Sequence, residues 1–276
     1  MSLTDQQIKE FGKTARKLRY KIVKMIGPEN PGHLGGSCSI AELLTVLYFY
    51  KMKHDPSNPK WPQRDRFILS KGHAALALYA VLCESGYFPE KELNTIKQIG
   101  SILQGHPDML KVPGIEANTG SLGQGLSIAC GIALAGKLDK INYRVYCLMG
   151  DGEIAEGQIW EASMAASFYK LDNLTAILDK NRVQATGPII ERFDTNPHKE
   201  KWLAGNWHVI EVDGHNFTEI ENALGQAEKN KNKPTLIIAH TVKGKGIPFA
   251  ENKAAFHNGI MSQEQYKQAL EAVNFN

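Results

Sequence analysis

The stretch YRVYCLMGDGEIAEG, residues 143–157, joins an apolar run to a cluster of acidic residues. The run at 143–149 is continuous rather than alternating, which predicts a strand buried on both faces, as in a parallel sheet. Three acids, Asp151, Glu153 and Glu156, follow directly after it. At the end of such a strand they are open to three interpretations: a metal site, a general acid or base, or a solvated turn.

Apolar runs of the same kind recur on either side of this stretch. They predict strands at 66–70, 174–179, 207–212 and 235–240, with helices near 74–84, 157–170 and 217–230. This alternation predicts a doubly wound α/β fold, a mostly parallel sheet with helices on both faces, which binds ligands beyond the carboxyl ends of its strands. No repeat or linker marks a second domain, so we expect residues 1–276 to form a single domain.

The sequence predicts two helix starts before the first of these strands. Thr4 and Gln7 form a capping-box pattern, and apolar residues then recur at steps of three and four until Gly-Pro at 27–28 stops the helix. Ser39 and Glu42 have the same spacing in front of a second apolar face. We therefore expect Ser39 and Glu42 to cap a second helix.

Composition excludes several classes of function. The chain has a net charge of +3, but its Lys and Arg residues are scattered, which argues against a nucleic-acid surface and favours a small anionic ligand. The polar N-terminus has no signal peptide, and no apolar run reaches membrane-spanning length. The four cysteines form no CxxC pair and are expected to be reduced core thiols. We therefore expect a cytoplasmic protein that contacts neither nucleic acid nor membrane.

Asp151 has a matching residue after the next predicted strand. Gly150–Gly152 follows one strand and Asn181 follows the next, so Asp151 and Asn181 are expected to face each other at one edge of the sheet. A carboxylate and an amide oxygen suit Mg²⁺ or Ca²⁺, which leave positions open for phosphate oxygens. Without such a cation, a diphosphate beside Asp151 would be repelled by roughly 4 kcal/mol per pair of unit charges. A Gly-Asp-Gly tripeptide alone is equally compatible with an ordinary turn.

Taken in order, the motifs resemble one family. GDGEIAEG followed by LDNLTAILDKN is similar to the thiamine-diphosphate motif of transketolases. Further segments recur in the family's order: NPGHLGG, DRFILSKGHAALALYAVL, GHPD, NTGSLGQGL, GNWHVIEVDGHN, and TVKGKGIP with FHNG. The resemblance runs almost end to end, but it covers only the family's N-terminal, diphosphate-binding (PP) domain. It implies the thiamine-diphosphate-binding fold.

The resemblance also implies a metal and cofactor site. Asp151, Asn181 and the backbone carbonyl of Val183 would hold Mg²⁺ or Ca²⁺. Many transketolases have Pro where this chain has Ser121, although the segment GSLGQG also occurs in the family. Lys243 suits a diphosphate as a point charge, and its alternative interpretation is a solvated loop lysine. The residues implied to line thiamine diphosphate are His73, Gly120, Ser121, Leu122, Gly150, Gly152, Asn181, Lys243 and His257.

Four histidines are implied to act on the substrate or cofactor. By resemblance His33 and His257 contact the substrate, His73 lies against the cofactor, and His106 lies near the reacting hydroxyls. Neutral imidazoles can donate to and accept from sugar hydroxyls, and they can shuttle protons near pH 7. The remaining histidines are assigned to structural roles: His54, His198, His208, His215 and His240.

The acids of the opening stretch are implied to have different roles. In this family the cofactor is activated by a glutamate of the pyrimidine-binding domain of a neighbouring subunit, and nothing in this chain matches that domain. Glu153 is expected to be a loop acid only. Glu156 matches a family glutamate in a proton-relay network at the subunit interface, or it merely pairs with a helix dipole, worth about 0.3–1 kcal/mol. Small residues would permit close helix contacts at such an interface: Gly131, Ala135, Gly136, Ala162, Ala165 and Ala166.

The chain therefore resembles the N-terminal subunit of a split transketolase that is inactive alone. The pyrimidine-binding and C-terminal domains are expected on a partner chain, the C-terminal transketolase subunit, in a heterotetramer of two copies of each chain. Such an enzyme moves a two-carbon ketol unit from a ketose phosphate to an aldose phosphate. A related enzyme for a branched or sulfonated ketose would leave this half of the site nearly unchanged.

Three other functions fit the sequence less well. The Gly-His loops at 33, 73 and 106 suit polyhydroxylated substrates and argue against the α subunit of a 2-oxo acid dehydrogenase. The segment LSKGHAALALYAVL and the short chain argue against a deoxyxylulose-phosphate synthase. A non-catalytic module that only captures the cofactor or a partner protein would not need His33, His73 and His257.

Overall fold

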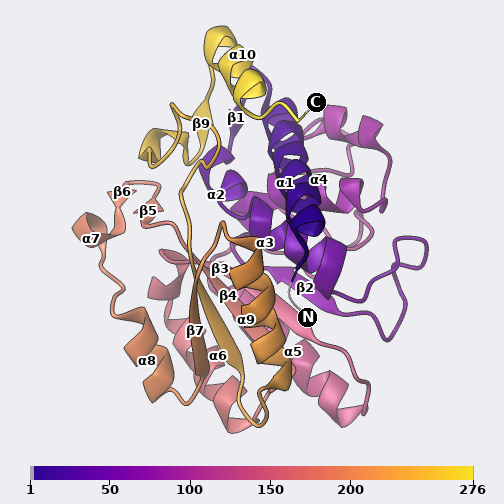
Figure 1. Ribbon diagram of the computed structural model, residues 1–276, viewed down its shortest axis with the longest axis vertical. Helices are drawn as coiled ribbons and strands as arrows, with labels where there is room; N and C mark the ends of the chain where they lie inside the picture. The colour runs from indigo at the N-terminus through magenta and orange to yellow at the C-terminus, as the bar shows by residue number, and fades with distance from the viewer. Residues whose placement is uncertain (1–2, 276) are drawn as a thin grey trace.

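A five-stranded sheet runs through the molecule, with its strands in the order β2-β3-β4-β8-β7 (Figure 1). The computed structural model describes residues 3–275, and each neighbouring pair of these strands is parallel. The strands are β2 Arg66–Leu69, β3 Val145–Gly150, β4 Leu174–Lys180, β7 His208–Asp213 and β8 Thr235–His240. Two small antiparallel sheets pair β1 Pro31–Gly32 with β9 Gly259–Ile260, and β5 Val183–Gln184 with β6 Gly187–Pro188. The predicted doubly wound α/β fold is confirmed.

Helices cover both faces of the sheet, and the sheet separates the hydrophobic core into two layers. Residues of α1, α2, α3, α4, α9 and α10 form one layer, and residues of α5, α6 and α8 form the other. Successive strand residues enter opposite layers, as Cys147 and Leu148 of β3 do. The helices are α1 Asp5–Ile26, α2 Leu34–Cys38, α3 Ala41–Val46, α4 Ala75–Glu84, α5 Gln124–Leu138, α6 Gly157–Phe168, α7 Ile189–Arg192, α8 His198–Ala204, α9 Phe217–Lys229 and α10 Gln263–Ala272.

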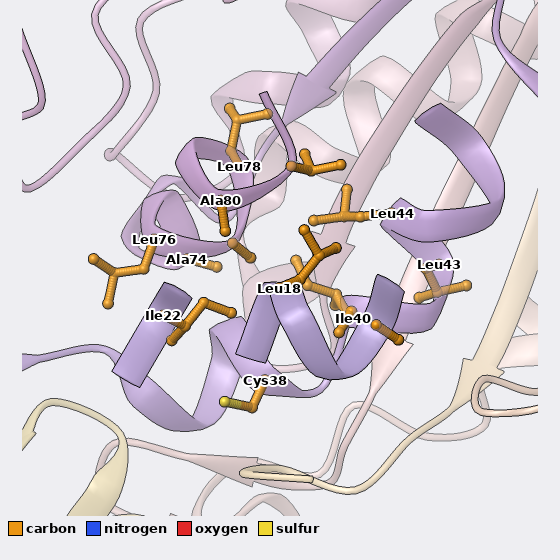
Figure 2. Close-up of a cluster of buried hydrophobic side chains, with 14 of the residues drawn as sticks. Leu18, Ile22, Cys38, Ile40, Leu43, Leu44, Ala74, Leu76, Leu78 and Ala80 are labelled. Atoms are coloured by element: carbon orange, nitrogen blue, oxygen red, sulfur yellow. The ribbon is translucent and has the colours of Figure 1, made fainter. Parts of the chain in front are cut away.

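The first layer is densest where α1, α2, α3 and α4 meet. Figure 2 shows their side chains gathered in one cluster, among them Leu18, Cys38, Leu44 and Leu78. Every residue of α4 from Ala75 to Cys83 is buried, which accounts for the uniformly apolar segment ALALYAVLC. The cluster anchors the segments on either side of α2 and α4, which carry part of the site described below.

The two predicted helix starts have different outcomes. Thr4 and Gln7 form the capping box of α1, and the helix ends at Gly27, which has a φ of 64°, as predicted. The prediction for Ser39 and Glu42 is wrong, because α3 begins after Ile40 and has no side-chain cap. Both polar side chains are instead drawn into buried tertiary contacts, which outweigh the stabilisation that a cap offers.

Two expectations from composition concern the cysteines and the helices. All four cysteines are unpaired and buried, as expected of core thiols. Between residues 3 and 275, no helix combines the length and the apolar character needed to cross a bilayer.

Replacing Leu44 with Ala should lower the free energy of unfolding by about 2–5 kcal/mol, because Leu44 is fully buried in the first layer. Ile99→Ala is the matched control, since Ile99 is fully exposed and its truncation should change stability by less than about 0.5 kcal/mol. Urea denaturation measures both values. Equal losses in the two variants would contradict this account of the core.

Candidate functional site

A cavity of about 310 Å³ lies at the carboxyl ends of β3 and β4. This is the edge where a doubly wound sheet binds its ligands. The loops after β2, β3, β4 and β8 all contribute residues to it. Most of the predicted site residues line this cavity: His73, Leu122, Gly150, Asp151, Gly152, Glu156, Asn181, Val183, Lys243 and His257.

Below the cavity, Asp179 is completely buried at the end of β4. Its Oδ2 atom accepts hydrogen bonds from Lys71 Nζ at 2.6 Å, from Ser39 Oγ at 2.7 Å and from Asn181 Nδ2 at 2.7 Å. Thr241 Oγ1 donates to Oδ1 of the same carboxylate. Burial alone would raise the pKa of Asp179, but Lys71 and these donors hold it below its usual value. One carboxylate thus joins four segments that are far apart in the sequence.

Sequence reasoning missed the pairing of Lys71 with Asp179. Lys71 follows one predicted strand directly, in SKGHAA, and Asp179 is the last residue of another, in LDKN. The sequence signal for this pair was a charged residue at the end of each of two apolar strands. Their pairing could not be inferred, because strand order was needed to show that the ends of β2 and β4 approach each other across β3.

Glu153 is not the loop acid that the sequence suggested. It is only 2% exposed and accepts hydrogen bonds from Ser70 Oγ at 2.5 Å, from the backbone N–H of Gly123 at 2.8 Å and from that of Gly150 at 2.9 Å. Burial raises the pKa of Glu153, and these donors oppose the rise. Glu153 therefore ties the loop after β3 to the loops that precede α4 and α5.

Asp151 and Asn181 lie on the same cavity, as the strand spacing predicts. The carboxylate of Asp151 accepts from the backbone N–H groups of Gly152 at 3.0 Å and Arg182 at 2.5 Å. The amide oxygen of Asn181 accepts from the N–H of Val183 at 3.2 Å. Burial and the nearby negative charge of Asp179 raise the pKa of Asp151 to about 7. A buried carboxylate of this kind is stabilised by a cation.

Lys243 supplies a positive charge to this cavity and is only 2% exposed, so it is not a solvated loop lysine. Its Nζ atom donates to the backbone carbonyl of Val183 at 2.7 Å and lies 3.0 Å from Nδ1 of His257. Burial and the charge of Lys71 lower the pKa of Lys243 to about 8. Because the ammonium donates to Nδ1, the ring proton of a neutral His257 lies on Nε2.

The oxygen atoms around Lys243 fit a hard divalent cation. The carbonyl of Val183 already faces one cation, the lysine ammonium, and the carboxylate of Asp151 and the amide oxygen of Asn181 lie on the same cavity. Among residues 3–275, His, Cys, Asp and Glu side chains form no group of three or more that could hold a metal. The oxygen set is therefore one carboxylate, one amide and one carbonyl, a combination typical of Mg²⁺ or Ca²⁺ rather than of zinc.

The loop that carries Lys243 is supported by a chain of buried polar contacts. Val242 donates its backbone N–H to Nε2 of His215 at 2.9 Å, so the proton of His215 lies on Nδ1 and is donated to Glu42 at 3.0 Å. Arg19 donates to both carboxylate oxygens of Glu42, at 2.7 and 2.6 Å. Burial would raise the pKa of Glu42, but Arg19 holds it at about 2. Glu42 therefore supports this loop from inside the protein instead of capping α3.

The four predicted histidines form one cluster around His33. The ring centroid of His33 lies 5.1 Å from that of His73, 5.5 Å from that of His257 and 6.5 Å from that of His106. Burial, followed by nearby lysine charges, lowers the pKa of His33 to about 4, of His73 to about 2 and of His257 to about 3. These three imidazoles are neutral at pH 7. They can donate to and accept from hydroxyl groups, but they do not titrate near pH 7 as the sequence suggested.

Four predicted site residues do not line the cavity: His33, His106, Gly120 and Ser121. Gly120 nevertheless contacts the histidine cluster. A Cβ atom on Gly120 would lie 2.9 Å from the ring of His106, and one on Gly72 would lie 2.6 Å from the backbone of Gly120. The loop before α5 and the loop after β2 are thus in backbone contact beside the histidines. Ser121 is exposed and does not line the cavity, nor does His106.

Glu156 is exposed at the rim of the cavity, directly before α6. Its side chain makes no capping hydrogen bond with that helix. The small residues expected at a helix contact differ in exposure. Ala162 and Ala166 are buried, and Gly136 leaves room for the ring of Tyr143, whereas Gly131 and Ala135 are exposed. An interface role for Glu156 and for these exposed positions stays a prediction.

Comparison with known proteins agrees with this geometry. Residues 10–276 match the family model for the thiamine diphosphate binding domain of transketolase. The chain belongs to the transketolase family. It is 46% identical over 268 residues to the 6-deoxy-6-sulfo-D-fructose transketolase subunit SqwG of Clostridium sp. (strain MSTE9), covering 97% of each chain. It is 42% identical to an apulose-4-phosphate transketolase subunit of Phocaeicola vulgatus, covering 97% of this chain and 95% of the relative.

Solved transketolases share the fold. The crystal structure of the Campylobacter jejuni transketolase matches with a TM-score of 0.89 and 36% identity, over 98% of this chain. The match covers 43% of that chain. The transketolase family member described here therefore spans less than half of that enzyme, but nearly the whole length of the two relatives named as subunits.

Lys71→Met should lower the free energy of unfolding by about 3–5 kcal/mol, because it leaves the carboxylate of Asp179 buried without its cation. The double variant Lys71→Met/Asp179→Asn should recover part of this loss, since it removes the unpaired charge. Urea denaturation of the parent and both variants measures the effect. A single variant that unfolds at the parent's midpoint would refute the importance given to this ion pair.

Asp151→Asn should stabilise the chain increasingly as the pH rises from about 4 to about 7, when metal and cofactor are withheld. The folded-state pKa of Asp151 is raised to about 7. Ionisation of Asp151 therefore destabilises the folded chain fully above pH 7, and this destabilisation diminishes as the pH falls toward about 4. The gain should reach at most about 4 kcal/mol and then level off. Urea denaturation at several pH values tests this, with Asp139→Asn, an exposed carboxylate, as the control. A gain that does not vary with pH is the contrary result.

Proposed function

We propose that this chain is the N-terminal, diphosphate-binding subunit of a two-chain transketolase that depends on thiamine diphosphate. Together with a C-terminal subunit it transfers a two-carbon ketol unit from a ketose phosphate to an aldose phosphate. The observation that carries this proposal is the cavity at the ends of β3 and β4. This cavity brings together three groups: oxygen atoms that could bind a divalent cation, a buried lysine, and neutral histidines.

Different residues of the cavity would bind the metal ion and the diphosphate of the cofactor. Asp151, Asn181 and the carbonyl of Val183 would bind Mg²⁺ or Ca²⁺, and Lys243 would meet the negative charge of the diphosphate. When bound, thiamine diphosphate supplies the nucleophilic carbon and electron sink that cleavage of a carbon–carbon bond beside a carbonyl requires. The predicted cofactor glycines, Gly150 and Gly152, leave this wall of the cavity without side chains.

His33 and His257 would contact the sugar, and His73 would lie against the cofactor. A neutral imidazole presents one donor and one acceptor, so His33 and His257 can each bridge neighbouring hydroxyl groups without adding charge, and His73 adds no charge beside the cofactor. The hydrogen bond from Lys243 fixes the ring of His257 with its Nε2–H free to donate. His106 lies beside His33 and completes the group.

The partner would supply what this single diphosphate-binding domain, residues 1–276, does not contain. The two relatives named as subunits are matched over 97% and 95% of their length, whereas a single-chain transketolase is matched over 43%. This supports a partner subunit. We propose that the partner carries the pyrimidine-binding domain and that two copies of each chain form a heterotetramer. Glu156, which is exposed at the rim of the cavity, would face that subunit. Four unpaired cysteines support a reducing, cytoplasmic setting.

A second candidate is a transketolase for a specialised ketose. It is favoured by the names of the two relatives, which refer to a sulfonated fructose and to apulose 4-phosphate. Both versions use the same cavity in this chain and differ in the far end of the sugar.

Reconstitution with the partner chain, Mg²⁺ and thiamine diphosphate should yield ketol transfer from at least one ketose phosphate. His73→Ala should reduce kcat/KM by roughly 10²–10⁴-fold while circular dichroism shows the fold retained. His240→Ala is the matched control, because His240 binds Glu211 outside the cavity and its loss should leave transfer near the parent rate.

Failure of the reconstituted complex to transfer from any ketose tried would overturn the proposal. Binding of thiamine diphosphate without any transfer would instead identify a cofactor-capturing module.

A further inference from the structure

Lys243 enters the cavity from the segment that follows β8. The two residues before it are anchored to different parts of the molecule. Thr241 donates its hydroxyl to the buried carboxylate of Asp179, and Val242 donates its backbone N–H to Nε2 of His215 at 2.9 Å. Because Val242 directly precedes Lys243, its contact with His215 holds the backbone from which the lysine side chain extends.

The imidazole of His215 is itself held in one orientation. His215 lies in the loop between β7 and α9, where its backbone N–H donates to Oδ1 of Asp213 at 2.8 Å. Its Nδ1 atom donates to Glu42 at 3.0 Å, and Arg19 holds that carboxylate with two hydrogen bonds. The side chain of His215 is 14% exposed and that of Glu42 is 8% exposed, so solvent screens this contact little. Both ring nitrogens of His215 are therefore used within the protein.

The side chain of Lys243 is packed closely along its length. A Cβ atom on Gly35 would lie 2.9 Å from Cγ of Lys243 and 3.0 Å from its Cε, so the aliphatic stem lies against the backbone of α2. The ammonium at its end donates to the carbonyl of Val183 at 2.7 Å. Because the stem is confined in this way, a displacement of the backbone at Val242 also displaces the ammonium.

We propose that His215 is a positioning residue for the diphosphate of the cofactor. This rests on the proposed function, in which Lys243 meets the negative charge of that diphosphate. Nε2 of His215 holds the backbone of Val242 and thereby fixes the ammonium beside the oxygen atoms that would bind the cation. A charge-assisted hydrogen bond is short, so a small displacement of the ammonium weakens it. His215 does not line the cavity and acts through Val242 and Lys243.

Two matched variants of His215 test the proposal in the complex with the partner subunit. His215→Asn places its amide near the position of Nδ1, so it can still bond to Glu42 but does not reach Val242. His215→Gln places its amide near the position of Nε2, so it can accept from Val242. Isothermal titration calorimetry at saturating Mg²⁺ measures the Kd for thiamine diphosphate. His215→Asn should raise this Kd by roughly 10–100-fold, and His215→Gln should keep it within about threefold of the parent value.

A double-mutant cycle separates positioning of Lys243 from a general structural role. Lys243→Met removes the ammonium, and in that background His215→Asn should change the Kd by less than about twofold, because the two residues act through one group. His54→Asn is the matched control, since His54 also makes two hydrogen bonds but does not line the cavity, and its Kd should equal the parent value. Equal losses in His215→Asn and His215→Gln, no loss in either, or a full loss in the Lys243→Met background overturns the proposal.

A second measurement tests the contact itself before any cofactor is added. The nitrogen NMR signals of the His215 ring should show a proton on Nδ1 and none on Nε2, because Nε2 accepts from Val242. A proton on Nε2 overturns the proposal, since that nitrogen could then not hold the backbone before Lys243. Lack of thiamine diphosphate binding by the parent complex is a failure of the proposed function instead.

Discussion

The buried ion pair between Lys71 and Asp179 is the interaction on which the site depends. Asp179 is the penultimate residue of β4, and Lys71 lies just after β2. The carboxylate also accepts hydrogen bonds from Ser39, directly after α2, and from Thr241, directly after β8. Lys71 donates in addition to the carbonyl of Gly36. A buried carboxylate is stable only if such donors satisfy it, so the loops that supply them are held in one arrangement. The cavity lies directly above this arrangement.

The same electrostatic logic extends into the cavity. Asp151 carries a raised pKa because burial and Asp179 both oppose its charge, and Lys243 carries a lowered one because burial and Lys71 oppose its charge. A divalent cation and a diphosphate together would relieve both. The histidines beside them stay neutral, because burial and the lysines oppose their protonation. The cavity is thus suited to charged ligands beside Asp151 and Lys243 and to hydroxyl groups beside the histidines.

Much of the fold and of the ligand edge could be predicted because the chain carries local signals. Continuous apolar runs indicated the strands within a residue or two, and the spacing of Asp151 and Asn181 indicated one edge of a parallel sheet. The prediction failed for Glu153, Ser39 and Glu42, all taken as local features. Each instead has a partner far away in the sequence, Ser70, Asp179 and Arg19 respectively. Periodicity and capping patterns describe neighbours along the chain and contain no information about such partners.

The sequence by itself determined the α/β class, the helix start at Thr4, the resemblance to transketolases and the residue types gathered at the site. Only the tertiary structure decided which buried acid meets which base, because strand order brings the end of β2 near the end of β4 across β3. It also decided that three histidines are neutral and that Lys243 is buried, since both depend on how much water the surrounding loops exclude. Burial is a property of the assembled loops, and the ionisation states in the cavity follow from it.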